Sequence, residues 1–221
     1  METLSFYLDN NITVCSGVEF TAGWETVKRR TESCKNSVHN AVREIINNVQ
    51  LYGDKSVLEY TARFDHVQPQ TLCLESNELE QAYAHVRKES PALIAALEQA
   101  AGNIRRFAEV QYAQLEDVRL TVAPGVTVGQ RVIPVERAGI YVPGGRYPLV
   151  STMLMGVIPA KVAGVKTIIV ATPPASSGMP HRVILAAAKL AGADAVYVMG
   201  GAQAIAALAY GTESVPRVDV I

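Results

Sequence analysis

A repeated alternation of strand and helix patterns constrains the fold of this chain more than any other feature. Three short apolar runs, each followed by a helical pattern, occupy the stretch from 138 to 209. The predicted strands are 138–142, 167–171 and 195–199, and the predicted helices are about 151–163, 180–191 and 202–209. Strands joined through helices run parallel by right-handed crossovers, so the pattern predicts a parallel sheet covered by helices.

Ligands of an open parallel sheet collect outside the carboxyl ends of its strands. The residues in that position are 141–146, 172–178 and 200–203. The first group contains Pro143, Gly144 and Gly145, followed by a helix that we expect to be capped by Ser151 or Thr152. A glycine turn leading into a helix either binds phosphate at the helix N-terminus or is a plain structural turn, and its spacing matches neither common nucleotide-binding fingerprint.

Two polar side chains in these segments are candidates for cofactor binding. Tyr141 offers a ring face and a hydroxyl, and Gln203 at a helix N-terminus both donates and accepts, which suits an adenosine or ribose edge. From the residues alone, a packed tyrosine and a capping amide are the preferred interpretations.

The first part of the chain has a different character. Residues 1–25 lack a strong period and form a predicted strand or arm, whereas 26–135 is a predicted helical region that ends in a β-hairpin. Within it we expect helices over 24–52, 56–64, from 76, and 91–112, a short strand at 72–74, and a hairpin that turns at Pro124 and Gly125. The segment 136–221 completes the predicted organisation as a Rossmann-like α/β domain.

Composition narrows the function classes. The chain of 221 residues is 49% hydrophobic with a net charge of -1, and no basic stripe or long apolar span occurs, so neither nucleic acid nor a membrane is an expected partner. Three widely spaced cysteines and the lack of a signal sequence favour the cytoplasm. His39 and His85 are isolated on polar helix faces, so no metal site is predicted, and Asp65 with His66 is predicted to cap and solvate a helix end.

The motifs together resemble the histidinol dehydrogenase family. Gly-Ile-Tyr-Val-Pro-Gly-Gly at 139–145 is followed by Ser-Thr-Met-Leu-Met at 151–155 and by Ile-Pro-Ala-Lys-Val-Ala-Gly-Val at 158–165. A second block begins with Gly-Gly-Ala-Gln at 200–203 and continues to Pro216. Two long blocks in the family's order make the resemblance specific.

The resemblance implies an NAD-dependent oxidoreductase that converts L-histidinol to L-histidine through histidinal, with two NAD, in histidine biosynthesis. It places NAD contacts at Tyr141 and Gln203, beside the turn of Pro143, Gly144 and Gly145. It also implies a homodimer, a bound zinc and a catalytic Glu-His pair. In the family the zinc ligands and that pair lie beyond the position of Ile221, so no catalytic or metal residue is assigned here.

These implications produce expectations about the chain as a whole. We expect it to be a truncated portion of a longer enzyme, inactive alone, with 26–135 belonging to a larger discontinuous domain and 136–221 forming an incomplete NAD-binding domain. Exposed apolar faces should then make the isolated chain prone to association. Two alternatives stay open, namely a paralogous NAD- and zinc-dependent dehydrogenase of another polar alcohol, or a non-catalytic dinucleotide-binding fragment.

Overall fold

The structure is a computed structural model that describes residues 4–8, 11–15, 18–144 and 147–221, with side chains described from Val38 onward. The chain forms two compact units, Met1–Glu44 and Ile45–Ile221. Among the described residues, none of the helices combines the length and the apolar character that crossing a membrane requires.

The first unit contains an antiparallel hairpin and the start of a long helix. Strand β1 (Leu4–Leu8) pairs with β2 (Asn11–Cys15), and α1 (Val18–Asp65) follows and continues into the second unit. The helix begins ahead of the predicted residue 24, because a polar stretch without proline is compatible with a helix even when its sequence has no clear period. The backbone of Gly53 leaves the helical conformation, with φ 53° and ψ -132°, which confirms the predicted break between two helices.

The second unit is built on a four-stranded mixed sheet with the order β3-β8-β7-β6. Strands β6 (Arg137–Tyr141), β7 (Thr167–Thr172) and β8 (Ala195–Val198) are parallel, as predicted. The two-residue strand β3 (Cys73–Leu74) pairs antiparallel with β8, an orientation that so short a segment does not reveal in sequence.

The chain reverses its direction across the sheet after β8. From β6 it steps to β7 and then to β8, but after the next helix it returns to the opposite side of β6, where Val220 forms a parallel bridge with Ala138. Gly139 N–H donates to the carbonyl of Val220 at 2.9 Å. This reversal is the topological switch of a doubly wound sheet, the place where such folds bind ligands.

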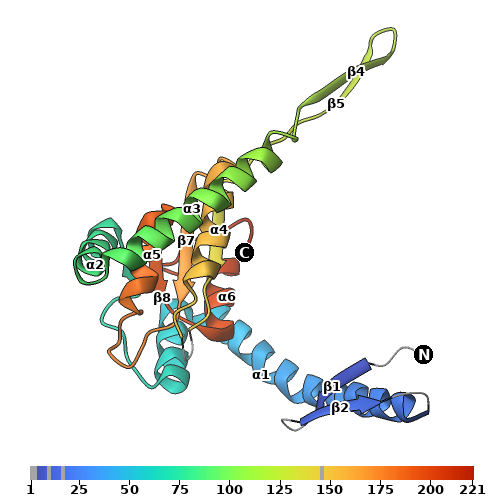
Figure 1. The fold of residues 1–221 in the computed structure, drawn as a ribbon, viewed down its shortest axis with the longest axis vertical. Coiled ribbons are helices and arrows are strands. Elements are labelled where there is room, and N and C mark those ends of the chain that lie inside the picture. The colour runs from blue at the N-terminus through green and yellow to red at the C-terminus, as the bar shows by residue number, and fades with distance from the viewer. Residues whose placement is uncertain (1–3, 9–10, 16–17, 145–146) are drawn as a thin grey trace. The chain divides into compact units, whose positions relative to one another are not determined.

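Helices cover both faces of the sheet (Figure 1). One face packs against α2 (Ser76–Glu89), α3 (Pro91–Tyr112), α4 (Val150–Val162) and α5 (Arg182–Ala191). The other packs against the second part of α1 and against α6 (Gly201–Tyr210). Strand β7 shows why both faces are buried, since Ile168 and Val170 belong to the first core and Ile169 and Ala171 to the second.

The predicted hairpin is present but takes no part in either core. Strands β4 (Val118–Ala123) and β5 (Val126–Gln130) pair only with each other, and all their residues are exposed. Gly125 occupies the turn with φ 76°, a conformation that favours glycine. Half-exposed valines and a leucine therefore form an uncovered apolar surface.

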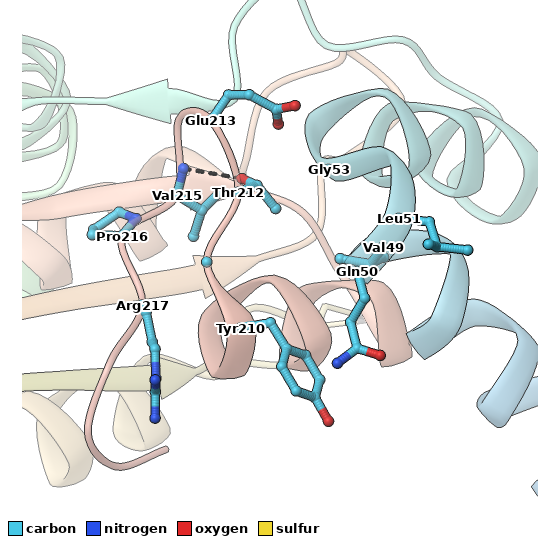
Figure 2. A pocket seen from close by; sticks show the side chains of 11 residues that line it. Val49, Gln50, Leu51, Gly53, Tyr210, Thr212, Glu213, Val215, Pro216 and Arg217 are labelled. Atoms are coloured by element: carbon cyan, nitrogen blue, oxygen red, sulfur yellow. Dashed lines mark hydrogen bonds between the residues drawn. The ribbon is translucent and has the colours of Figure 1, made fainter.

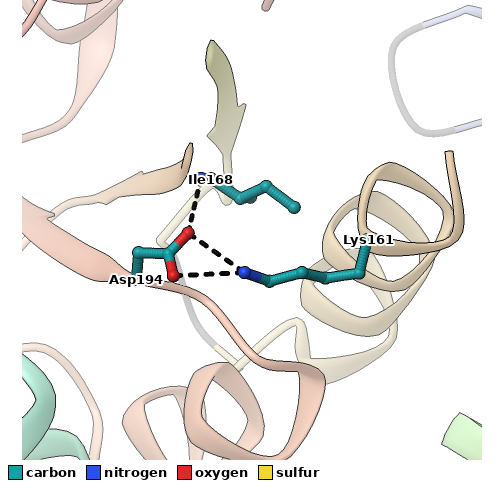
Figure 3. A network of polar contacts seen from close by, with 3 residues as sticks. All are labelled: Lys161, Ile168 and Asp194. Carbon is teal, nitrogen blue, oxygen red and sulfur yellow. Dashed lines mark hydrogen bonds and ion pairs between the residues drawn. The ribbon is translucent and has the colours of Figure 1, made fainter. Parts of the chain in front are cut away.

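The amino ends of the parallel strands are fixed by a small polar network (Figure 3). The carboxylate of Asp194 accepts a hydrogen bond from Ile168 N–H at 2.7 Å and pairs with Lys161 Nζ at 3.1 Å. Asp194 precedes β8, Ile168 lies in β7, and Lys161 lies in the last turn of α4. The network thus joins three elements at the edge opposite the predicted ligand site.

Candidate functional site

The carboxyl ends of the three parallel strands meet around Pro173. A Cβ atom added to Gly144, after β6, would lie 2.2 Å from Pro173 Cγ, and one added to Gly200, after β8, would lie 2.6 Å from Pro173 Cβ. Both distances are shorter than any stable carbon contact, so the loops pack closely only because these two residues lack side chains. Gly144 is not among the described glycines with positive φ. Close packing, rather than backbone strain, therefore explains why this residue is a glycine.

Tyr141 ends β6 and connects it to the first turn of α6. Its hydroxyl accepts a hydrogen bond from Gly201 N–H at 3.1 Å, and its ring is partly buried against the α6 face of the sheet. Gly201 has φ 60°, a left-handed conformation that admits glycine readily. This contact brings two predicted candidate segments, 141–146 and 200–203, to one point.

Gln203 lies at the same helix N-terminus and is almost completely buried, with 1% of its surface exposed. Its Oε1 atom has no hydrogen-bond partner among the described residues. The same atom would lie 2.7 Å from a Cβ added to Gly201, so the Gln203 amide is turned toward the first residue of α6. A buried acceptor without a donor costs about 1–3 kcal/mol, which marks this side chain for explanation.

A small cavity of about 160 Å³ lies beside Gly144 and Pro173. It is lined by the turn and by the loop between β7 and α5, namely Pro143, Gly144, Tyr147, Pro148, Thr172, Pro173, Pro174, Ala175, His181 and Ile184. Tyr141 and Gln203 are not part of this lining, and Gly145 lies outside the described residues. The structure therefore groups Pro143 with Gly144 at the cavity, and Tyr141 with Gln203 at the α6 N-terminus.

One prediction about a helix start is wrong and another is confirmed. Helix α4 begins at Val150 with Leu149 as its N-cap and without a side-chain cap, so Ser151 and Thr152 lie within its first turn. Helix α2 begins at Ser76, as predicted, with Glu75 as its N-cap, and the Glu78 carboxylate accepts from Glu75 N–H at 3.1 Å.

The histidines and Asp65 have surroundings that sequence reasoning did not foresee. His85 is not isolated, since its Nε2 lies 2.9 Å from Arg182 Nη1 and 3.0 Å from Glu89 Oε2, in a groove between α2 and α5. Asp65 does not act as a fully solvated cap, because its Oδ2 is buried with no partner among the residues that the structure describes, and burial raises the pKa of its carboxyl group. Within the described ranges, no three His, Cys, Asp or Glu side chains gather in a way that would hold a metal ion.

A second cavity, of about 430 Å³, lies beside the break in α1 (Figure 2). The loop after α6 forms one wall, where Val215 N–H donates to Thr212 Oγ1 at 3.1 Å. The Glu213 carboxylate accepts from Asp54 N–H at 2.8 Å, directly after Gly53, and Thr212 Oγ1 donates to the Asp54 carboxylate. A Cβ atom on Gly53 would clash with the Glu213 carboxylate. These contacts connect α1 to the loop after α6. A structural role is therefore enough to account for Gly53, Asp54, Thr212 and Glu213.

The open, mixed sheet with its switch beside β6 defines an α/β protein of Rossmann-like organisation. The sequence profile of histidinol dehydrogenase matches residues 28–221. Because this match covers most of the chain, the protein belongs to the histidinol dehydrogenase family.

Individual relatives agree with this assignment. The chain is 50% identical over 185 residues to a histidinol dehydrogenase of Oceanobacillus iheyensis, covering 83% of this chain and 42% of the relative. It is 45% identical over 184 residues to one of Methanosarcina barkeri, with the same coverage of 83% and 42%. The crystal structure of histidinol dehydrogenase from Elizabethkingia anophelis superposes with a TM-score of 0.75 at 36% identity, over 83% of this chain and 41% of that one.

The comparisons also show how much of its relatives this chain covers. The chain spans about two fifths of the length of the relatives it matches. The match shows the family.

Proposed function

We propose that this chain is the NAD-binding portion of an enzyme that oxidises L-histidinol to L-histidine through histidinal, using two NAD, in histidine biosynthesis. Membership of the histidinol dehydrogenase family supports the reaction class. The observation that carries the cofactor assignment is the buried Oε1 of Gln203 at the N-terminus of α6, beside the switch of the sheet, which has no hydrogen-bond partner in the part of the chain that the structure describes.

The proposed NAD site consists of Tyr141, Pro143, Gly144, Gly145 and Gln203. NAD fits this part of the fold for two reasons. The turn of Pro143 and Gly144 lines a cavity at the carboxyl ends of the parallel strands, and the Gln203 amide at the N-terminus of α6 has a buried acceptor with no partner among the described residues. Bound NAD would supply the hydride acceptor, and these residues would bind and orient it.

The remaining assignments are part of the same proposal. We assign 136–221 to the NAD-binding domain, 26–135 to a larger discontinuous domain, and 1–25 to an arm. Zinc and the catalytic acid and base are assigned to no residue of this chain, and we derive no step through zinc. We also propose that the complete enzyme is a cytoplasmic homodimer that acts on L-histidinol.

Calorimetric titration of NAD tests the site directly. Tyr141→Ala removes a ring face and a hydroxyl, and Gln203→Ala removes a hydrogen bond worth about 0.5–1.5 kcal/mol, so each should weaken binding several-fold. The matched control is Gln99→Ala on the exposed surface of α3, which should leave the affinity unchanged. Equal affinities for all four proteins would show that the turn and the α6 N-terminus do not bind the cofactor.

Turnover tests the substrate. A protein of the relatives' full length that contains these residues should reduce NAD with histidinol and zinc, and should do so better than with a panel of other polar alcohols. Preference for another alcohol would replace the substrate while keeping the cofactor site. Absence of NAD reduction with every alcohol would overturn the proposed reaction.

A further inference from the structure

Helices α2 and α5 lie against each other (Figure 1), and a groove of about 800 Å³ is formed between them. Buried apolar side chains, Val86 and Leu185, form part of its lining. The imidazole of His85 also lines the groove, and its Nε2 lies 2.9 Å from Arg182 Nη1 and 3.0 Å from Glu89 Oε2. One imidazole nitrogen therefore contacts both a cation and an anion.

These two contacts require opposite protonation states of the same nitrogen. A guanidinium has only donors, so Nε2 of His85 accepts from Arg182 only when the nitrogen carries no proton. A carboxylate has only acceptors, so Nε2 bonds to Glu89 only when the nitrogen carries a proton. One nitrogen cannot do both at once, so the two contacts are alternatives.

The proton on His85 decides which contact forms, because its surroundings are open to water and contain charges of both signs. The side chain is 39% exposed, so solvent supplies the proton. Among the described residues that line the groove, α2 contributes Glu78 and Glu89 as charged groups, α5 contributes Arg182, the loop before α5 contributes His181, and the α3 residue Leu93 is uncharged.

A second histidine at the start of α5 also has to be unprotonated at the nitrogen that it uses. His181 is the N-cap of α5, and its Nδ1 accepts from Val183 N–H at 3.3 Å. A proton on Nδ1 would remove this acceptor, and the positive end of the helix dipole disfavours a cation there. His181 lines both the groove and the small cavity beside Gly144, so the start of α5 forms part of the wall of both.

We propose that His85 is a proton-dependent switch at the contact between α2 and α5. Without a proton, Nε2 accepts from Arg182 and joins the two helices. With a proton, Nε2 donates to Glu89 on its own helix, and the resulting cation repels Arg182. Protonation of His181 removes the cap of α5 in the same pH range. Acidification therefore loosens the start of α5 and widens the groove, whereas neutral pH closes the contact.

Double-mutant cycles at two pH values measure this exchange of partners. The melting temperatures of His85→Ala, Arg182→Ala and the double variant give the coupling of His85 to Arg182, and a second set with Glu89→Ala gives its coupling to Glu89. Histidine changes its charge between about pH 5 and about pH 8, so the melts are recorded at about pH 8 and about pH 5.5. The coupling to Arg182 should be favourable by about 2–4 °C at the higher pH and lost at the lower one. The coupling to Glu89 should change in the opposite direction.

Two further variants replace a histidine by an amide that does not titrate. The amide of His85→Gln both donates and accepts at either pH, so it can bond to Arg182 and to Glu89 without a change of charge. The amide of His181→Asn is a favourable N-cap at either pH. Each variant should therefore gain stability relative to the wild-type protein as the pH falls.

The pair of Lys189 and Glu80 is the matched control, since it also joins α5 to α2 but contains no histidine. Its coupling should be equal at the two pH values. Opposite pH dependence of the two His85 couplings, with the control unchanged, supports the switch. A coupling to Arg182 that is absent at the higher pH, or equal at both, would overturn it. An amide variant that gains no stability as the pH falls would overturn the role of the histidine that it replaces.

Discussion

At the scale of single residues, the carboxyl end of the sheet depends on glycines that contact one proline. Gly144 and Gly200 approach Pro173 from the loops after β6 and β8. The sequence shows glycines after strands, but it does not show which side chain they face. The sequence leaves a phosphate-binding turn and a plain structural turn open at Gly144, and packing against Pro173 is sufficient to require a glycine there.

Gly144→Ala should therefore destabilise the protein by about 1–3 kcal/mol, the usual cost of overpacking. Because the new Cβ atom meets Pro173 Cγ, the substitution Pro173→Ala in the same chain should recover part of that loss. Urea unfolding of the two single variants and the double variant measures this coupling. Strictly additive losses would mean that Pro173 does not limit the space beside Gly144.

Asp65 provides the second prediction at this scale. Burial raises the pKa of its carboxyl group, an effect that the nearby His66 reduces. Asp65 therefore binds a proton more readily in the folded protein than in the unfolded chain, where an aspartate has a pKa of ~3.9. Ionised Asp65 destabilises the folded protein above its pKa in the folded state, and this destabilisation disappears as the pH falls toward the pKa of the unfolded chain.

Asp65→Asn should consequently raise the free energy of unfolding at pH 7, and the gain over the wild-type protein should shrink as the pH approaches ~4. Chemical unfolding at several pH values measures it, and Glu109→Gln on the exposed face of α3 serves as the control. A gain that stays constant with pH would mean that the ionisation of Asp65 is not its cause.

At the scale of elements, the parallel strands and their helices were predictable and their mutual contacts were not. Alternating apolar runs gave β6, β7, β8 and the helices between them to within one or two residues. The antiparallel pairing of β3 was not predictable, because a segment as short as Cys73–Leu74 has no period of its own. The N-cap of α4 was misplaced because the helix begins after Leu149, without the polar capping residue that a sequence pattern reveals.

The Asp194 network predicts a change in stability without a change at the ligand site. Asp194→Ala leaves the partly buried Ile168 N–H without an acceptor and removes the pairing with Lys161, at a cost of about 1–2 kcal/mol. Since the network lies at the amino ends of the strands, NAD affinity should remain that of the wild-type protein. Thermal melts measure the stability and titrations measure the NAD affinity of the same preparation. A loss of affinity would contradict the prediction, because it would mean that the network at the amino ends of the strands affects the ligand site.

At the scale of the whole molecule, the sequence predicted the α/β class and the family, but not how the candidate residues divide. Pro143 and Gly144 line a cavity, whereas Tyr141 and Gln203 meet at the N-terminus of α6. The switch beside β6 was not predicted either, because Val220, which bridges Ala138, lies far along the chain. The uncovered apolar surface of the β4–β5 hairpin agrees with the expected tendency to associate, which stays a prediction.

The central claim is that the carboxyl end of this sheet binds NAD, and hydrogen exchange measured by mass spectrometry with and without NAD tests it most directly. We predict slower exchange in peptides covering 139–149 and 199–206, and unchanged exchange in the hairpin 118–130 and in the loop 211–217. Slower exchange confined to 211–217, beside the cavity at the break in α1, or no change in either predicted segment under saturating NAD, would contradict the claim.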